Sequence, residues 1–403
     1  MRCLGFVLAC SLVGVRVPVT AAEPAATDPS HLEYIETHIH LHADSPAGYE
    51  AAAQHALKFM DKVGIRECLI MPPPFTPGQD HLYTYKSLLA VVKGHPGRFA
   101  FLGGGGLLNP VIQKAVAAGK TTDAMKKEFR KKAEEIARAG AVGFGEFAAE
   151  HFSFDRNHPH ISAPPDHELF KLLADIAAEK GLPIDLHMEA VAEPDFPFPR
   201  DRFTARSDRN PETLKENVTG LERLLAHNRK AKIIWVHAGW DHTGHFSVEL
   251  LRRLLQAHPN LYFSVKDHYH SLAQNRLLDN GRLKPEWIEL MSDFPDRFLL
   301  GSDMFYPDPS LPMRFPDSTN GSREILNQLP MDLARKVAFE NTGLVYGLGI
   351  KPEEMASERS YQPLPQEELL EGRGRGQGQG GGEGPGRRRG PPGGRRRGPP
   401  QGF

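Results

Sequence analysis

Histidines alternate with other residues in the segment ETHIHLH, at positions 38, 40 and 42. Side chains two positions apart on a β-strand point to the same face, so His38 and His40 can bind one divalent metal ion together. His42 continues the same spacing, so the metal-binding pair could instead be His40 and His42. A His-x-His motif alone is a weak signal, and its meaning depends on the rest of the chain.

Metal-binding side chains also stand at the ends of four other apolar runs: Glu146 in GFGE, His187 in IDLH, His237 in IIWVH and Asp303 in LLGSD. Taken singly, a histidine at a strand end more often makes a hydrogen bond at the rim, and an acidic residue there often caps the next helix. Independent rim residues need not recur at the same end of five runs. The joint pattern predicts that four histidines, one glutamate and one aspartate converge on one metal centre.

Eight apolar runs have the length and composition of β-strands, at residues 33–38, 66–71, 98–103, 141–146, 183–188, 233–238, 261–266 and 298–303. Amphipathic patterns predict helices in several of the gaps, at 47–63, 123–139, 166–180, 211–227 and 248–258. This alternation predicts an α/β fold, a single-domain (β/α)8 TIM barrel over residues 31–350. No Gly-x-Gly-x-x-Gly motif opens a helix after the first strand, which argues against an open doubly wound sheet. A barrel would bring the six metal-binding residues to one mouth, because its strands all end there.

The segments ETHIH, GFGEF, PIDLH, WVHAG, LLGSD and AFENTGLVYGL resemble the amidohydrolase superfamily, in particular its amidohydrolase-related group of metal-dependent hydrolases, over roughly residues 33–349. The resemblance implies that His38 and His40 bind a buried metal ion with Asp303, while His187 and His237 bind a second ion or assist the substrate. In branches similar to phosphotriesterases or TatD-type deoxyribonucleases, an acidic or carbamylated residue of strand 4 bridges two ions. Glu146 occupies that position here, which favours a binuclear ligand set without lysine carbamylation. The expected cofactor is one or two divalent ions, with Zn²⁺ favoured, and the alternative for Glu146 is a role outside the ligand set.

This arrangement suits hydrolysis of an ester, lactone, amide or phosphoester by metal-activated water, with Asp303 accepting the proton and passing it to the leaving group. No Gly-x-Ser-x-Gly motif suggests a serine nucleophile instead. A mononuclear metal-dependent decarboxylase of the same family is the alternative. A second alternative is a polyanion-binding protein that acts through its C-terminal tail.

A small-molecule substrate would meet the loops that follow the strands. Lys266 and His268 stand at the end of the seventh strand and are the candidate substrate-binding residues, because cationic groups at a barrel mouth can bind a carboxylate or phosphate. The loop after the fifth strand adds arginines and phenylalanines at Arg200, Arg202, Arg206, Phe196, Phe198 and Phe203. It is at least as good an explanation that the arginines are solvated charges of the loop and that the phenylalanines have a structural role.

The N-terminus is typical of a secretory signal peptide over residues 1–22, with a short charged start, an apolar stretch and small residues before Glu23. Arg16 makes the apolar stretch too short for a membrane-spanning helix, so the mature chain should lack a transmembrane segment. We expect export to the periplasm or medium after cleavage near Ala22; lipoprotein processing at Cys10 is a weaker alternative. Cleavage would leave Cys68, which lies in an apolar run, as the single cysteine of the mature chain.

The chain of 403 residues has a net charge of −1, but its charge is unevenly distributed. Residues 371–403 contain 14 Gly, 5 Pro and 8 Arg with two acidic residues, so this end carries +6 and the other 370 residues carry −7. Such a segment has almost nothing apolar to bury, and we expect a disordered Arg/Gly/Pro-rich tail over 360–403. Its charge could contact polyanions.

Overall fold

The computed structural model describes residues 28–78, 85–154, 159–201, 204–311 and 320–365. The chain divides into two units, Met1–Pro365 and Gln366–Phe403. The second unit, with the Arg/Gly-rich part of the expected tail, and the expected signal peptide at 1–22 both lie outside the described residues. Among the described helices, none is both long enough and apolar enough to cross a membrane.

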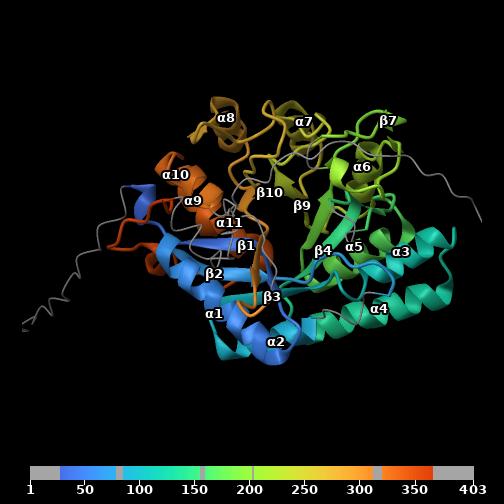
Figure 1. Cartoon of the computed structure of the whole chain (residues 1–403), viewed down its shortest axis with the longest axis horizontal. Helices are drawn as coiled ribbons and strands as arrows, with labels where there is room; N and C mark the ends of the chain where they lie inside the picture. The colour runs from blue at the N-terminus through green and yellow to red at the C-terminus, as the bar shows by residue number, and fades with distance from the viewer. Residues whose placement is uncertain (1–27, 79–84, 155–158, 202–203, 312–319, 366–403) are drawn as a thin grey trace, which may run out of the picture. The chain divides into compact units, whose positions relative to one another are not determined.

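A mostly parallel sheet forms the centre of the first unit (Figure 1). Its parallel strands are β1 (Tyr34–His42), β2 (Ile65–Ile70), β3 (Phe99–Gly104), β4 (Gly143–His151), β6 (Ile184–Met188), β9 (Ile233–Ala238), β10 (Leu261–Val265), β13 (Phe298–Leu300) and β14 (Met304–Pro307). Neighbouring strands follow the order β13-β10-β9-β6-β4-β3-β2-β1-β14. Each predicted strand overlaps one of these strands. The α/β class and the parallel sheet are therefore confirmed.

The eighth predicted strand, 298–303, is a strand only over its first half, β13, and β14 begins directly after it at Met304. Its first part, β13, pairs with β10, and β14 pairs with β1, with only residues 301–303 between them. Asp303 N also donates to His38 O at 3.0 Å across this junction. The pairing is thus consistent with the predicted eight-stranded barrel, although residues 301–303 themselves are not strand.

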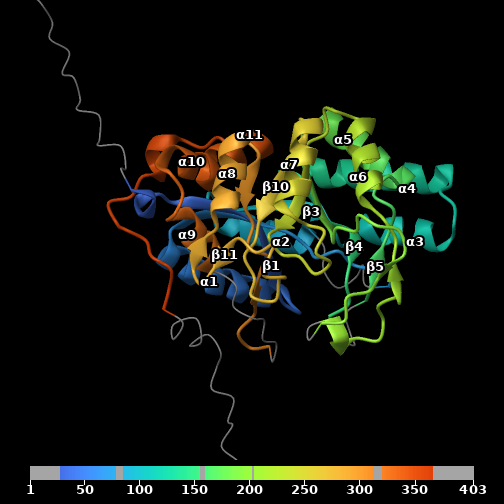
Figure 2. The ribbon, with the colours of Figure 1, turned by 90° about the horizontal axis from the view of Figure 1, so that it is seen from above.

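Helices follow most of the strands and lie outside them (Figures 1 and 2). They are α1 (Pro46–Val63), α2 (Tyr85–Gly94), α3 (Asn109–Ala117), α4 (Asp123–Arg138), α5 (Glu168–Lys180), α6 (Val218–His227), α7 (Val248–Ala257), α8 (Pro285–Asp293), α9 (Asn320–Leu326), α10 (Met331–Arg335) and α11 (Asn341–Tyr346). Local sequence sets several of their ends. Thr122 accepts a hydrogen bond from Met125 N at the start of α4, and Gly64 takes a left-handed conformation, φ 76°, after α1.

The predicted helix over 211–227 is wrong in its first seven residues, 211–217. Thr213–Leu214 forms the short strand β8, which pairs with β7 (Phe196–Pro197), and α6 begins only at Val218. The Asn217 side chain donates to Glu189 O and accepts from Val191 N. These bonds tie the segment before α6 to the loop after β6, so it cannot continue the helix.

The packed part of the chain extends beyond the expected boundary at residue 350. Residues 351–365 pack near the N-terminal segment, where Tyr361 N donates to Ser30 O and Ser357 N donates to His31 O. The buried Arg323 guanidinium lies between the rings of Tyr34 and Tyr361, at 4.8 and 5.3 Å from their centroids. The expected tail, 360–403, therefore begins with residues that belong to the packed unit.

Candidate metal centre

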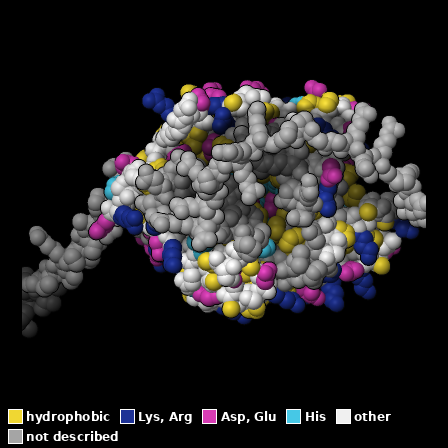
Figure 3. Space-filling view, viewed as in Figure 1, with side chains coloured by type: hydrophobic (Ala, Val, Ile, Leu, Met, Phe, Trp, Pro, Cys, Tyr) yellow, Lys and Arg dark blue, Asp and Glu magenta, His cyan; other side chains and the backbone are white. Residues whose placement is uncertain are grey.

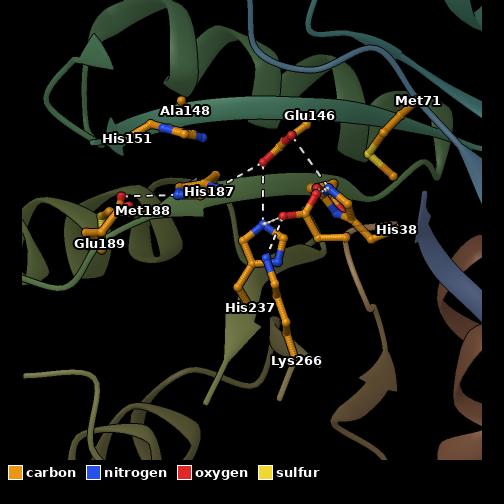
Figure 4. A network of polar contacts seen from close by, with 12 residues as sticks. His38, Met71, Glu146, Ala148, His151, His187, Met188, Glu189, His237 and Lys266 are labelled. Carbon is orange, nitrogen blue, oxygen red and sulfur yellow. Dashed lines mark hydrogen bonds and ion pairs between the residues drawn. The ribbon is translucent and has the colours of Figure 1, made fainter. Parts of the chain in front are cut away.

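His38 and His40 are buried on β1, with their Nε2 atoms 3.1 Å apart. Figure 4 shows His38 with Glu146 and His237 beside it. The other nitrogen of each ring faces an acceptor. His40 Nδ1 is 2.8 Å from Met71 O, and His38 Nδ1 is 3.2 Å from Asp185 Oδ1. A proton on each Nδ1 leaves both lone pairs on Nε2, so the two rings present their metal-binding atoms to one point. The structure thus brings together the first of the two candidate pairs, His38 with His40.

Glu146, on β4, lies between two pairs of histidines. Its Oε2 atom is 3.5 Å from His38 Nε2 and 3.3 Å from His40 Nε2. Its Oε1 atom is 3.0 Å from His187 Nδ1 and 3.6 Å from His237 Nε2. Burial alone would raise the pKa of this carboxyl, but the charge of His38 and the contacts with the other imidazoles hold the pKa well below its usual range. Glu146 is therefore a carboxylate with one oxygen directed at each pair.

Asp303 completes the cluster from the junction between β13 and β14. Its Oδ1 atom is 3.2 Å from His40 Nε2, and its Oδ2 atom is 2.6 Å from Lys266 Nζ and 3.7 Å from His237 Nε2. The charge of Lys266, with the nearby histidines, outweighs burial and keeps the pKa of Asp303 well below its usual value. Both Asp303 and His237 have positive φ, 55° and 66°, a conformation that non-glycine residues adopt at a cost. Such backbone strain is common where side chains must be aimed at a functional site.

Three buried carboxylates that the sequence interpretation did not select support this cluster. Asp185 contacts His38, as described above. Glu189 Oε2 is 3.1 Å from His187 Nε2, and this contact outweighs burial to hold the pKa of Glu189 at about 2. Glu36 accepts from Ser302 N at 2.7 Å, and burial raises its pKa to about 7. Each lies two residues from a predicted ligand on the same chain segment, a spacing that could have indicated Glu36, Asp185 and Glu189.

The two candidate substrate-binding residues lie beside the metal centre, around Trp240. Lys266 Nζ is 3.4 Å from the centroid of the Trp240 ring, and the His268 ring centroid is 5.6 Å from it. Burial lowers the pKa of Lys266 and, with the charges of Lys266 and His270, lowers that of His268 to about 2, so His268 is neutral. In the space-filling view, histidine, acidic and apolar side chains are visible near the middle of the drawn face (Figure 3).

The other loop residues considered from sequence are not brought to this cluster by any described contact. Phe198 is buried in a separate apolar group with Phe152, Val191 and Leu214, which is a structural role. Arg200 is exposed. Arg202, Phe203 and the side chain of Arg206 lie outside what the structure describes.

The side chains at this centre fit a divalent metal ion. Ligand atoms lie within 4.8 Å of one another in the groups His38–His40–Glu146, Glu146–His187–His237, His38–His237–Asp303 and His151–His187–Glu189. Mixed imidazole and carboxylate donors suit ions such as Zn²⁺ and Mn²⁺. All six predicted ligands thus belong to one connected set in which Glu146 is shared by two groups.

Comparison with solved structures returned many that are similar at low sequence identity. A putative amidohydrolase from Staphylococcus aureus is 14% identical, with 79% of this chain and 100% of that chain covered and a TM-score of 0.42. A dihydroxybenzoic acid decarboxylase from Polaromonas sp. JS666, with bound manganese and the inhibitor 2-nitroresorcinol, is 14% identical over 79% and 98% of the two chains, with a TM-score of 0.47. A probable 2-pyrone-4,6-dicarboxylic acid hydrolase from Acinetobacter baumannii, with bound citric acid, is 14% identical over 78% and 100%, with a TM-score of 0.44.

No curated protein sequence matches the chain significantly. The model of one protein family, described as Amidohydrolase, matches residues 84–348. This match covers more than half of the chain and includes four of the six predicted ligands, Glu146, His187, His237 and Asp303. The chain therefore belongs to the amidohydrolase family.

Proposed function

We propose that this protein is a metal-dependent hydrolase that acts on an ester, lactone, amide or phosphoester through two divalent ions. The observation that carries the proposal is the position of Glu146, whose two oxygens face different histidine pairs. His38, His40 and Asp303 would hold one ion, and His187 and His237 the other, with Glu146 shared. Zn²⁺ is the ion we favour, because it accepts this mixture of nitrogen and oxygen ligands at low coordination number.

The charge of the cluster supports binding of two ions. Glu146, Asp185, Glu189 and Asp303 are buried or nearly so, and Lys266 contacts one of them, Asp303, at 2.6 Å. With neutral imidazoles these five groups carry −3. An uncompensated buried charge is costly, and divalent ions bound at this cluster would offset it.

Bound divalent ions supply Lewis-acid polarisation of the substrate and lower the pKa of water. Asp303 is placed to accept the proton of the attacking water and to pass it to the leaving group. Lys266 donates to Asp303 Oδ2 and holds this carboxylate ionised, which is the form that accepts a proton. Lys266 and His268, which both lie near the Trp240 ring, would bind the substrate.

The test combines elemental analysis with a panel of esters, lactones, amides and phosphoesters. We expect hydrolysis by the metal-loaded wild type and a loss of at least about 10²-fold in kcat for Asp303→Asn, the effect expected when a proton-transfer group is removed. Glu146→Ala should hold one metal equivalent less than the wild type. Hydrolysis that survives complete metal removal would contradict the proposal.

A mononuclear decarboxylase is the second candidate, favoured by one observation. His38, His237 and Asp303 form a group that can hold a single ion without Glu146. This candidate requires equal metal content in the wild type and Glu146→Ala, and release of CO₂ from a carboxylic acid. Measuring CO₂ release in parallel with the hydrolase panel separates the two reactions.

We also propose that the protein is exported after removal of residues 1–22. The tripartite pattern of the N-terminus supports this proposal. N-terminal sequencing of the mature protein tests it, with a start near Glu23 expected. An intact Met1 would contradict it.

A further inference from the structure

Three metal-binding side chains, His151, His187 and Glu189, form a group next to the two that share Glu146. The Glu189 Oε2 atom is 3.1 Å from His187 Nε2, and the His151 ring stacks on the His187 ring with centroids 4.1 Å apart. Figure 4 shows Glu146 and Glu189 on opposite sides of His187. His187 therefore presents Nδ1 to the inner cluster and Nε2 to this outer group.

The tautomer of His151 suits metal binding. Its Nδ1 atom is 2.9 Å from Phe152 O, a backbone acceptor, so Nδ1 carries the proton and Nε2 the lone pair. His40, one of the inner ligands, has the same arrangement, with Nδ1 donating to Met71 O. A backbone carbonyl that fixes the ring in this way is a common feature of metal-ligating histidines.

Glu189 is held in place by its surroundings. Asn217 Nδ2 donates to Glu189 O at 2.8 Å, and Asn217 Oδ1 accepts from Val191 N at 2.9 Å. The other carboxylate oxygen, Oε1, accepts from Phe152 N at 3.4 Å. The carboxylate is thus positioned before any ion arrives, which reduces the ordering cost of binding.

We propose that His151, His187 Nε2 and Glu189 form a third cation site, for a divalent transition-metal ion such as Zn²⁺. Two nitrogens and one carboxylate oxygen leave a fourth, open position for water or a ligand group. His187 would offer Nε2 to this site and Nδ1 to the inner one, which requires that the ring give up its N–H proton to solvent. The site goes beyond the proposed function and does not depend on the reaction catalysed.

The test compares full-length wild type with His151→Asn, and uses His160→Asn as the matched control. His160 lies close to the same strand but contacts Glu150, outside the outer group. Each protein is loaded with Zn²⁺, passed through gel filtration and analysed for bound metal. His151→Asn should hold one equivalent less than the wild type, and His160→Asn the same number.

Anomalous diffraction from Zn²⁺-loaded wild-type crystals locates the ion directly, even if His151→Asn does not fold. A peak is expected beside His187 Nε2, between His151 and Glu189. Equal metal content in wild type and His151→Asn, or no peak at this position, overturns the proposal and leaves Glu189 as a group that only orients His187. If the third ion is found but the protein hydrolyses no compound on the panel, the proposed function is overturned and this site is not. If the protein is a hydrolase but holds no third ion, this site is overturned and the proposed function is not.

Discussion

Three of the four histidines at the metal centre have an acceptor against the ring nitrogen that faces away from the shared cluster. His40 is held by Met71 O, His38 by Asp185 and His187 by Glu189. Each contact selects one tautomer and fixes the ring plane, so the ligating nitrogens are arranged before metal binding. The geometry of the inner candidate site therefore depends on residues that do not themselves bind an inner ion.

Replacing Asp185 by asparagine tests this dependence. Asp185→Asn keeps the shape of the side chain but removes the charge that faces His38 Nδ1, so we expect metal affinity to fall by about 10- to 100-fold. Competition with a chelator measures the change. Asp175→Asn is the control, since Asp175 pairs with His227 at the surface, 3.1 Å away. Equal affinities for wild type and Asp185→Asn would contradict the orienting role.

The metal-free protein should lose stability as pH rises above neutrality. Burial opposes protonation of His187, but Glu189 and Glu146 outweigh it and raise its pKa from 6.5 to about 10. A raised folded-state pKa gives a stabilisation that is complete below pH 6.5 and is lost as pH rises to about 10. Unfolding temperatures of chelator-treated protein between pH 6.5 and 10 should fall, with a shallower fall for Glu189→Gln. Parallel profiles for the two proteins would contradict this explanation.

The same proton must leave before His187 can bind a metal ion. Metal affinity should therefore rise over the same pH window, with proton release on binding. Titration calorimetry in two buffers of different ionisation enthalpy measures the released protons.

At the scale of elements, the strands were predictable because each is an apolar run long enough to form one strand of the parallel sheet. Residues 33–38 and 233–238 lie within one residue of β1 and β9 at their starts. The register that brings Asp185 to His38, however, depends on contacts between different strands. The local sequence pattern predicts that Asp185 and His38 each lie on a strand, but it cannot show that their side chains contact each other. The amphipathic pattern from 211 to 217 was misleading for a related reason. Within this segment, Thr213 and Leu214 form β8 and pair with β7 instead of forming a helix.

The loop after β9 holds Trp240 and depends on one buried carboxylate. Asp241 Oδ1 accepts from Thr243 N at 3.1 Å, and Oδ2 accepts from Gly244 N at 2.9 Å and from Asn275 Nδ2 at 2.7 Å. This carboxylate therefore fastens the loop that carries Trp240 to the loop after β10.

Asp241→Ala removes these bonds and should cost on the order of 3 kcal/mol in the free energy of unfolding, because hydrogen bonds to charged groups are the strong ones. Hydrogen exchange should increase in residues 240–247 and 271–276. Asp279→Ala, at an exposed position, is the control. Unchanged exchange in Asp241→Ala would show that the two loops are held by other contacts.

At the scale of the whole first unit, residues far apart in sequence meet around Arg323. Its guanidinium donates to Val63 O and Leu32 O, each at 2.9 Å, and contacts the rings of Tyr34 and Tyr361. No local pattern in the segment 351–365 indicated this packing, because polar and charged residues surround Tyr361. The sequence therefore predicted the parallel α/β unit, but residues 351–365, beyond the expected boundary at 350, also pack with it.

Arg323→Met should destabilise the fold by about 3–5 kcal/mol, because it leaves buried carbonyls without their charged donor. Denaturant unfolding measures this change. Arg335→Met is the control, since Arg335 pairs with Glu340 at a partly exposed position and such pairs contribute about 1 kcal/mol or less. If both variants lost the same free energy of unfolding, Arg323 would not be the residue that holds the segments around residues 32, 63 and 361 together.

The central claim is that Glu146 is shared by two ions, and anomalous diffraction from metal-loaded crystals tests it most directly. At Glu146 the wild type should show two peaks about 3.5–4 Å apart, one on each side of the carboxylate. These two are separate from the peak expected beside His187 Nε2. Glu146→Ala should keep the peak at His38 and His40 and lose the one at His187 Nδ1 and His237. A single peak at the same position in both proteins would contradict the binuclear centre.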